Sequence, residues 1–529
     1  MSKVLKTLYF PLFILFLTVS AGIYLRPLLP VDETRYISVA WEMFSKHSFL
    51  VPLLNGEPYH HKPPLLFWLI DFIWYIFGVS QNTVRFIPSF FAAATLAIIY
   101  LFAKNLWEED EKSSYISPLV LSSMAFFTFF SSMLTFDIML TFWVTLLSYF
   151  IFLAAKRESF KYWIFAGIAI GGGALTKGPV ILVHTLPVIL LISLWKKDID
   201  KKRWFLGFLS AFFIGLFIAL LWAIPAAIEG GEEYRKAIFW GQSANRVVSS
   251  FAHRHPFWWY LPFLFVLFLP WFLFDKVLES LKSVKFFYKK NEGVRFLIVW
   301  LIGAVFLFSL ISGKQIQYLL PEIPAAALLF SRFISLKFSE ISNSSSKYIS
   351  VLYIFIGVVL SLGVGYLAFI ENRYSLRIAP LLIMSLFIIF IGIALKKIKY
   401  PSTNFHLKAI ALSVSIFIIS LHAGMIDVWK IQSLKQTAQK IKELQNRGKE
   451  IAVVGKYHGE YHFLGRLTKP LIVIKKDKKA YLRFVKKHPQ AVVVYRVKKN
   501  KNLKIKPFFR YPFRNGWIIF MKPHDLFKV

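Results

Sequence analysis

VDETRYISVAWEMF (residues 31–44) follows directly on an apolar run, residues 8–29, that is long enough to cross a bilayer. A second polar segment, GEPYHHKPP, comes soon after it at residues 56–64. Charged side chains are costly to place at a membrane boundary, and where they crowd there they usually serve a substrate or an ion. The two segments therefore predict a functional site just outside the first span. The alternative is an interfacial loop whose charges have no further role.

The composition is that of a polytopic membrane protein. Of the 529 residues, 57% are hydrophobic and 18% are aromatic, which is rare in a soluble chain. The chain has no Cys, so disulfides and thiolate metal sites are excluded. The 64 Lys and Arg outnumber the 28 Asp and Glu, and the net charge of +36 suits anionic lipid head groups or phosphate-bearing substrates. We predict no nucleic-acid partner, because this charge is spread over loops and a tail between membrane spans.

Apolar segments predict 13 membrane spans. We interpret residues 8–29 as an uncleaved first helix, because the apolar sequence continues beyond the signal-peptide-like site at residues 19–21. With the N-terminus inside, the basic loops 196–203, 275–295 and 396–408 all fall in the cytoplasm, as the positive-inside rule requires, and the C-terminus lies outside. The later spans are predicted near 86–104, 115–134, 138–155, 162–176, 179–195, 204–225, 257–274, 295–311, 319–336, 348–370, 378–395 and 408–424.

Two helices of the first outer loop, residues 30–85, are predicted to lie in the membrane interface. Residues 34–46 repeat apolar side chains at helical spacing, which is typical of an amphipathic helix. Residues 63–78 are strongly apolar but shorter than the ~20 residues that a span needs, and Asp71 lies at their middle. Counting them as a span would also turn the three basic loops outward.

The sequence changes character after residue 424. A helical pattern at 430–447 precedes short apolar segments at 451–455, 471–475, 491–496 and 516–521, with a further helix near 478–488. This order predicts a small α/β domain outside the membrane. We therefore divide the chain into a membrane domain, residues 1–424, with outer loops 30–85 and 226–256, and an outer domain, residues 425–529. The outer domain is strongly basic, which indicates either contact with anionic lipid or a solvated charged surface.

Two acidic positions face outward in this topology. Asp32 and Glu33 are adjacent, so on a helix their side chains point about 100° apart. One of them can face a substrate while the other caps the helix that follows. Asp137 lies at the outer boundary between two spans, where an ionisable group is usually functional, although a structural hydrogen bond is the alternative.

The outward segments also supply a set of cations. Around a carboxylate, converging cations describe a site that grips phosphate while a group attached to that phosphate reacts. Any one of them taken alone is equally consistent with a cation that snorkels to the interface. The set consists of Lys62, Lys177, Arg246, Arg254 and Lys314, and Tyr318 comes from the same outer turn as Lys314.

Histidines in two outer loops form a weaker pattern. His60 or His61, with His253 and His255, offers imidazole ligands that suit zinc. A His-x-His spacing alone is not specific for a metal. We therefore predict no required cofactor, with zinc as the alternative.

The order of these motifs resembles a known family. A first span followed by DETRY (32–36), YHHKPPL (59–65), Asp137, LTKGP (175–179) and YHFLGR (461–466) is similar to the aminoarabinose transferases. These belong to the GT-C superfamily of polyprenyl-phosphate-sugar glycosyltransferases, whose related members transfer galacturonic acid to lipid A or mannose to protein. The resemblance implies an all-α, GT-C-type protein of the bacterial inner membrane, with about 13 transmembrane helices and a C-terminal α/β domain in the periplasm.

The resemblance also implies roles for individual residues. Asp32 would be the catalytic carboxylate. The ligands of the donor phosphate would be Tyr59, Lys62, Tyr318 and either Arg254 or Arg246. The family often has an acidic residue immediately before the lysine, where this chain has His61. That departure speaks against an acid-dependent metal site and is compatible with a different sugar.

The function implied by the resemblance is an inverting, monomeric glycosyltransferase. It would move 4-amino-4-deoxy-L-arabinose or galacturonic acid from a polyprenyl-phosphate donor to lipid A or another anionic lipid at the periplasmic face. A hydroxyl acceptor would need Asp32 as general base, whereas a phosphate acceptor is already anionic. Two rivals are a protein O-mannosyltransferase of the same fold and a lipid-linked-sugar transporter. The transporter should show a repeat interface, and we find no convincing internal repeat.

Overall fold

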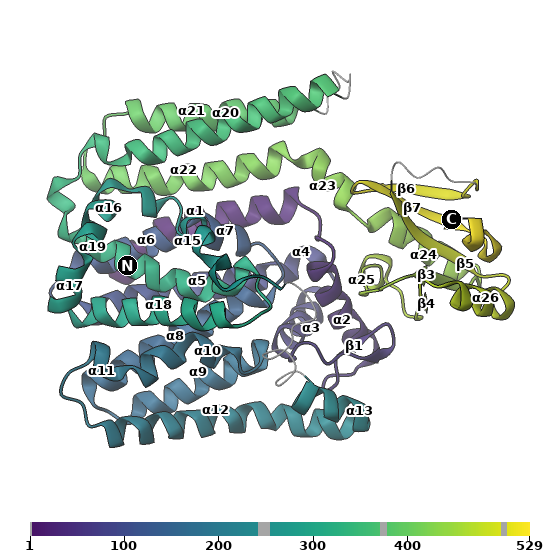
Figure 1. Cartoon of the computed structure of the whole chain (residues 1–529), viewed down its shortest axis with the longest axis horizontal. Coiled ribbons are helices and arrows are strands. Elements are labelled where there is room, and N and C mark those ends of the chain that lie inside the picture. The colour runs from purple at the N-terminus through teal and green to yellow at the C-terminus, as the bar shows by residue number, and fades with distance from the viewer. Residues whose placement is uncertain (1–2, 242–253, 371–377, 499–504, 529) are drawn as a thin grey trace. The chain divides into compact units, whose positions relative to one another are not determined.

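The computed structural model describes residues 3–241, 254–370, 378–498 and 505–528 (Figure 1). Contacts between residues divide the chain into two compact units. The first, which we call the helical unit, comprises Met1–Leu25, His61–Leu65 and Arg85–Met425. The second, which we call the α/β unit, comprises Arg26–His60, Leu66–Val84 and Ile426–Val529.

Nine helical segments in the described residues are long and apolar enough, by length and composition, to cross a membrane. They coincide with nine of the predicted spans and confirm the polytopic helical fold. They are α1 (Lys3–Leu25), α5 (Phe86–Leu106), α8 (Phe136–Arg157), α12 (Lys201–Glu229), α18 (Glu292–Leu310), α19 (Ile323–Leu336) with the preceding 3-10 helix η4 (Ile316–Glu322), α20 (Lys347–Ile370), α21 (Ala379–Lys397) and α22 (Thr403–Gly424).

The other four predicted spans form helices that are shorter than these nine or that are interrupted. The total of 13 spans therefore stays a prediction. Residues 162–176 form α9 (Lys161–Lys177), which has 17 residues. The remaining three are broken into pieces, as are the connecting segments. The pieces are α6 (Glu111–Ser122), α7 (Ala125–Phe130), α10 (Val180–Leu190), α11 (Ile192–Trp195), α13 (Gly231–Lys236), η1 (Ala237–Gly241), η2 (Phe257–Tyr260), α15 (Leu261–Leu267), η3 (Trp271–Leu273), α16 (Asp275–Lys282), α17 (Val284–Lys290), η5 (Phe338–Glu340) and η6 (Asn343–Ser346).

Side-chain caps fix where several of these helices begin. Asp200 accepts a hydrogen bond from the backbone N–H of Arg203 at the start of α12, and Asn291 does the same for Val294 at the start of α18. Such caps satisfy backbone donors that the first helical turn leaves without a partner. Both capping residues lie in loops predicted to be cytoplasmic. Polar side chains in these loops therefore determine where α12 and α18 begin.

Glycines allow α9 to pack directly against α12, its neighbour in Figure 1. A Cβ atom at Gly171 would lie 2.7 Å from the side chain of Ile218, and one at Gly215 would lie 2.4 Å from that of Ile170. Small residues let membrane helices approach until their backbones are close, which increases packing where the hydrophobic effect is weak. This pair of helices holds the end of α9, and therefore Lys177, in place.

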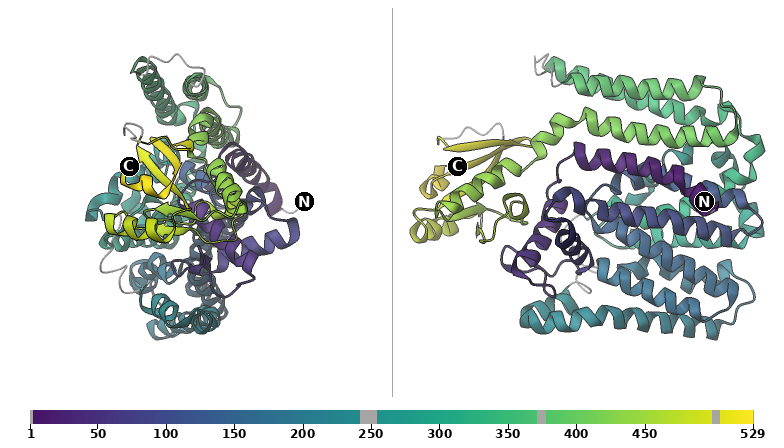
Figure 2. Two further views of the ribbon diagram at one scale, coloured as in Figure 1. Left: turned by 90° about the vertical axis from the view of Figure 1, so that its right-hand side faces the viewer. Right: turned by 180° about the vertical axis from the view of Figure 1, so that it is seen from behind.

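The C-terminal part of the α/β unit, coloured green to yellow in Figure 2, contains a sheet. It has five strands in the order β4-β3-β5-β7-β6. The strands β3, β4 and β5 are parallel, whereas β7 pairs antiparallel with β5 and β6. Apolar clusters cover both faces, one with α24 and one with α26, and this confirms the predicted α/β domain. The elements are α23 (Ile426–Gln432), α24 (Lys435–Asn446), β3 (Ile451–Val454), α25 (His462–Gly465), β4 (Ile472–Ile474), α26 (Lys478–Lys487), β5 (Val492–Lys498), β6 (Phe509–Phe513), β7 (Gly516–Met521) and η7 (Pro523–Lys528).

Strand β6 was not among the predicted strands. Its sequence, FRYPF, contains Pro512, which lacks the N–H that a central strand must donate. The structure accommodates this proline because β6 is at the edge of the sheet, where one side of the strand needs no partner.

The first outer loop belongs to the same compact unit as residues 426–529. Its helix α2 (Asp32–Lys46) receives a hydrogen bond from the N–H of Phe463 to Ser38 Oγ at 3.0 Å. Trp74 of α3 (Leu65–Phe77) stacks on the Phe463 ring, with 5.3 Å between centroids. The YHFLGR motif at 461–466 therefore supplies part of the contact between the outer loop and the sheet domain. The loop's smaller elements are β1 (Leu53–Leu54), β2 (Glu57–Pro58) and α4 (Gln81–Val84).

Helix α3 has 13 residues, too few to cross a membrane. Phe72, Tyr75 and Phe77 are exposed on it, and exposed aromatic side chains of this kind suit the predicted interfacial position. Asp71 is buried, and both of its carboxylate oxygens lack a hydrogen-bond partner in the described structure. Burial raises the pKa of Asp71 to about 8, because the charged form is penalised in apolar surroundings.

The topology can be tested with single cysteines, since the native chain has none. We expect Phe286→Cys on α17 to be protected from a membrane-impermeant maleimide in intact cells, because it lies in a loop predicted to be cytoplasmic. Gln490→Cys, in the C-terminal domain, should react once the outer membrane is permeabilised. The reverse pattern of labelling would show that the topology is inverted.

Candidate active site

Predicted site residues from four segments meet in the helical unit. Asp137 lies in the first turn of α8, where a carboxylate interacts favourably with the helix N-terminus. The ammonium of Lys177, the last residue of α9, pairs with this carboxylate at 2.5 Å, and both side chains are 12% exposed. The same ammonium lies 4.8 Å from the centre of the Tyr318 ring in η4. The Lys62 ammonium lies 5.5 Å from the centre of the ring of Phe136, which is the residue immediately before Asp137 in the chain.

Local sequence explains why Lys177 ends α9 at this place. Gly178 has φ of +79°, a conformation that glycine adopts without strain and that ends the helix. Pro179 follows with a φ of −67° and leads directly into α10. The LTKGP motif thus reverses the chain immediately after Lys177 and leaves its ammonium beside Asp137.

The turn between α18 and η4 is tied to the end of the second outer loop. Arg254 pairs with Gly313 in an isolated antiparallel bridge. The ammonium of Lys314 donates to the carbonyl of His255 at 3.1 Å and to that of Ile311. Lys314 is only 2% exposed, and burial lowers its pKa. Lys314 therefore holds the backbone of this turn in place. The sequence analysis placed Lys314 among the cations of the site and did not predict this structural role.

The helical unit also contains a buried polar pair that the sequence analysis missed. His184 of α10 and Glu322 of η4 lie 2.7 Å apart, and each side chain is 1% exposed. The signal was present, since ionisable residues inside apolar spans are functional or paired by default. Because Glu322 is in the same 3-10 helix as Tyr318, its bond to His184 fixes η4 against α10.

We expect Glu322→Gln to lower stability by about 1 kcal/mol, because a neutral amide keeps a hydrogen bond but loses its charge assistance. It should also raise the KM for the polyprenyl-phosphate donor that the resemblance implies, since η4 positions Tyr318. Thermal unfolding in detergent and donor titration measure the two effects. Glu340→Gln is the matched control, because Glu340 forms an exposed pair with Lys337 whose loss should change little. Equal melting temperatures for both variants would contradict this role.

A second cluster lies in the α/β unit, around the start of α2. Asp32 is the first residue of the helix, its side chain is 50% exposed, and its carboxylate accepts hydrogen bonds from Arg35 and, at 3.4 Å, from the Tyr36 hydroxyl. Burial alone would lower the pKa of Arg35, but Tyr59, Tyr36 and Asp32 together raise it. The structure thus adds Arg35 to the candidate site. Its position three residues after Asp32 on a helix was the sequence signal for this contact.

Glu33 occupies a different environment from its neighbour. Its side chain is fully buried and forms an ion pair with Arg26, and Glu33 Oε2 also accepts the N–H of Leu29 at 2.9 Å. These bonds close the turn that connects α1 to α2. Asp32 is therefore the exposed carboxylate of the adjacent pair, and Glu33 is the one with structural partners.

The structure describes two of the three histidines of the predicted zinc site, His61 and His255. Arg246 and His253 lie outside the described residues. His255 stacks on Trp259 with 4.4 Å between ring centres, and His61 belongs to the helical unit. No group of three or more His, Asp or Glu placed to hold a metal is found in the portion of the chain that is described.

Comparison with known proteins gives one family and a consistent set of relatives. Residues 61–223 match the family described as dolichyl-phosphate-mannose-protein mannosyltransferase. The undecaprenyl phosphate-alpha-4-amino-4-deoxy-L-arabinose arabinosyl transferase of Pectobacterium atrosepticum is 31% identical over 343 residues, which are 64% of this chain and 60% of that relative. A second enzyme of that name from Pseudomonas fluorescens is 28% identical over 67% of this chain and 64% of its own length. These matches confirm the resemblance over somewhat less than two thirds of the relatives' length.

Solved structures show that the fold extends over the whole chain. ArnT from Cupriavidus metallidurans, bound to undecaprenyl phosphate, matches with a TM-score of 0.75 over 98% of both chains at 15% identity. The archaeal oligosaccharyltransferase AglB from Archaeoglobus fulgidus matches with a TM-score of 0.55 over 94% of this chain and 70% of its own. The chain therefore has the GT-C-type fold that the resemblance implied.

Proposed function

We propose that this chain is an inverting glycosyltransferase that uses a polyprenyl-phosphate sugar at the periplasmic face of the bacterial inner membrane. The observation that carries the proposal is the contact of Asp137, Lys177 and Tyr318, with Lys62 beside them, at helix ends in a fold of this type. Cations and a tyrosine at the end of membrane spans suit a phosphate whose lipid tail stays in the bilayer. The names of the similar enzymes support the same donor class.

In this proposal the reaction is a single displacement at the anomeric carbon. The bond from that carbon to the donor phosphate oxygen breaks, and a bond to an acceptor oxygen forms on the opposite face. The polyprenyl phosphate leaves as a monoester dianion, and Lys62, Lys177 and Arg254 stabilise the developing charge. Asp137 orients the Lys177 ammonium, while Tyr59 and Tyr318 donate hydrogen bonds to the phosphate.

Asp32 is proposed as the catalytic carboxylate. With a hydroxyl acceptor it takes the proton as general base. With a phosphate acceptor, which is already anionic, it orients the acceptor or stabilises positive charge on the sugar. Arg35 holds the Asp32 carboxylate in either case.

The proposed acceptor is lipid A, and the proposed sugar is 4-amino-4-deoxy-L-arabinose, acting through a monomeric enzyme. Galacturonic acid is the second candidate, because the chain has an excess of cations and His61 stands where the family often has an acid. Mass spectrometry of lipid A from strains with and without the gene tests both, since the two sugars differ in mass and charge. Mannose on secreted proteins would favour the O-mannosyltransferase instead. Absence of sugar transfer by purified enzyme in detergent would favour a transporter.

We propose that the enzyme needs no metal. We expect treatment with a chelator to leave the rate of sugar transfer unchanged, with metal content measured in the same sample. Zinc bound by His61, His253 and His255 is the alternative. A rate of sugar transfer that falls on chelation and returns when zinc is added would support this alternative.

A further inference from the structure

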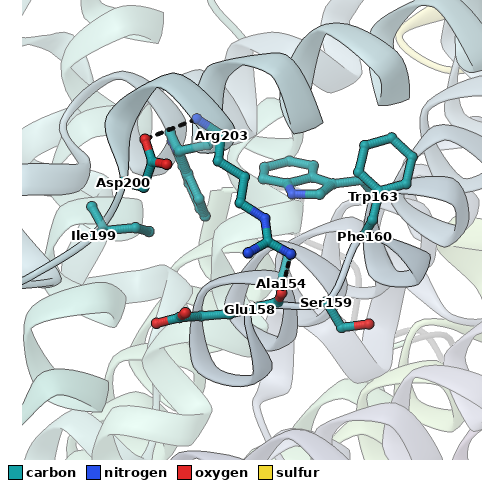
Figure 3. Close-up of a pocket in the computed structure, with 9 residues that line it drawn as sticks. Ala154, Glu158, Ser159, Phe160, Trp163, Ile199, Asp200 and Arg203 are labelled. Atoms are coloured by element: carbon teal, nitrogen blue, oxygen red, sulfur yellow. Dashed lines mark hydrogen bonds between the residues drawn. The ribbon is translucent and has the colours of Figure 1, made fainter.

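A pocket lies in the helical unit at the opposite end of α8 and α9 from Asp137 and Lys177 (Figure 3). It has a volume of about 60 Å³ and opens to solvent. Its walls come from the end of α8, the start of α9 and the start of α12. The lining includes Glu158, Phe160, Trp163, Asp200, Arg203 and Trp204.

The aromatic wall of this pocket is fixed before anything binds. Trp163 and Trp204 are buried and meet edge to face, with ring centres 4.8 Å apart. The indole N–H of Trp204 donates to the carbonyl of Ile189 at 3.0 Å. A Cβ atom at Gly207 would lie 2.2 Å from Trp163, so the glycine is what lets this indole pack on α12. Phe160, at the rim, is 50% exposed.

The segments that form the polar side of the pocket, residues 156–161 and 196–203, contain eight Lys and Arg against three Asp and Glu, and this charge favours an anion. Arg203 extends between Trp163 and Glu158 in Figure 3 and uses one guanidinium nitrogen to donate to the Glu158 carbonyl at 3.1 Å. Two acids also line the pocket, namely Asp200, whose carboxylate accepts the Arg203 backbone N–H as the cap of α12, and Glu158, and both are exposed to solvent. Lys161, Lys197, Lys201 and Lys202 are close in the chain to residues that line the pocket, and they form no ion pair in the part of the chain described by the structure.

An apolar surface continues from the pocket along the two helices. On α12, Leu206, Leu209, Phe213 and Phe217 are all exposed, and Ile168 on α9 is exposed as well. Residues 162–176 and 204–225 are both predicted membrane spans, so we expect these exposed apolar side chains to face lipid tails. A ligand with a phosphate at one end and hydrocarbon at the other fits this arrangement, because each end meets a matching surface.

We propose that this pocket is a binding site for an anionic phospholipid of the cytoplasmic leaflet. Its phosphate is held by Arg203, with Lys201 and Lys202 nearby, and its acyl chains lie along α9 and α12. Basic pockets between membrane helices on the cytoplasmic side are typical binding sites for anionic lipid. The segment 196–203 is among the basic loops predicted to be cytoplasmic, so the site is separate from the proposed transfer site.

Native mass spectrometry of the purified full-length protein in detergent tests this proposal. The ligands are phosphatidylglycerol, zwitterionic phosphatidylcholine, inorganic phosphate and ATP. We expect phosphatidylglycerol to remain bound and the other three not to. Arg203→Gln should weaken its binding by about tenfold, since a hydrogen bond to a charged group contributes about that much.

A second variant guards against a folding defect, because Arg203 also bonds to the loop between α8 and α9. Lys201→Gln with Lys202→Gln leaves that bond intact and should also weaken phosphatidylglycerol binding. Lys289→Gln with Lys290→Gln on α17 is the matched control and should bind as the native protein does. Equal binding of the two phospholipids, unchanged binding in the Lys201/Lys202 variant, or equally tight binding of phosphate or ATP would overturn the proposal.

Discussion

Replacing Asp32 with Asn is expected to lower kcat by about 10²- to 10⁴-fold, the usual effect of removing a positioned general base. Asn keeps the size and hydrogen bonding of the side chain but removes its charge. Donor affinity should change little, because the proposed phosphate ligands remain. The measurement is transfer of radiolabelled sugar to lipid acceptor, with donor binding measured separately.

The control for this variant is Asp427→Asn in the same unit. Asp427 lies in the first turn of α23 and pairs with Lys430 three residues later, as Asp32 pairs with Arg35. Loss of such a surface pair should leave the transfer rate near the native value. Native turnover in Asp32→Asn would rule out its catalytic assignment. An equal loss in both variants would mean that the effect arises from disrupting a helix start.

Replacing Lys62 with Ala is expected to reduce kcat/KM by about 10- to 100-fold, the equivalent of one charge-assisted hydrogen bond at about 1.5–3 kcal/mol. The contact to phosphate is present before the reaction and strengthens as the phosphate leaves. Both donor affinity and turnover should therefore fall. Lys285→Ala on α17 is the control, because this exposed lysine is in a loop predicted to be cytoplasmic. If donor affinity were unchanged in Lys62→Ala, phosphate recognition would have to be assigned to Lys177 or Arg254.

The membrane topology made part of the candidate site predictable. Asp137, Lys177 and Tyr318 were all placed at the outer ends of spans, because span ends alternate between the two sides of a membrane. The structure brings these three side chains together. The ion pair itself could not be read from the sequence, since its members are 40 residues apart and nothing local relates α8 to α9.

Other features depended on tertiary contacts that the sequence does not display. From the sequence, Glu33 could be identified only as an acidic residue near the start of a helix. The structure shows that Glu33 is buried in an ion pair with Arg26. His184 and Glu322 are 138 residues apart, and each looked like an isolated polar residue in an apolar segment. The YHFLGR motif was visible by resemblance, but its use as a contact for α2 and α3 required the folded chain.

The buried carboxylate of Asp71 makes folding of the α/β unit a proton-consuming process. In an unfolded chain this group ionises above about pH 4, whereas in the folded unit its pKa is about 8. Between these two values the folded state holds a proton that the unfolded state has released, so the contribution of Asp71 to stability falls as the pH rises. Above pH 8 both states are ionised and the contribution stays at its least favourable level. Asp71 therefore contributes more to the stability of this unit at mildly acidic pH than above pH 8.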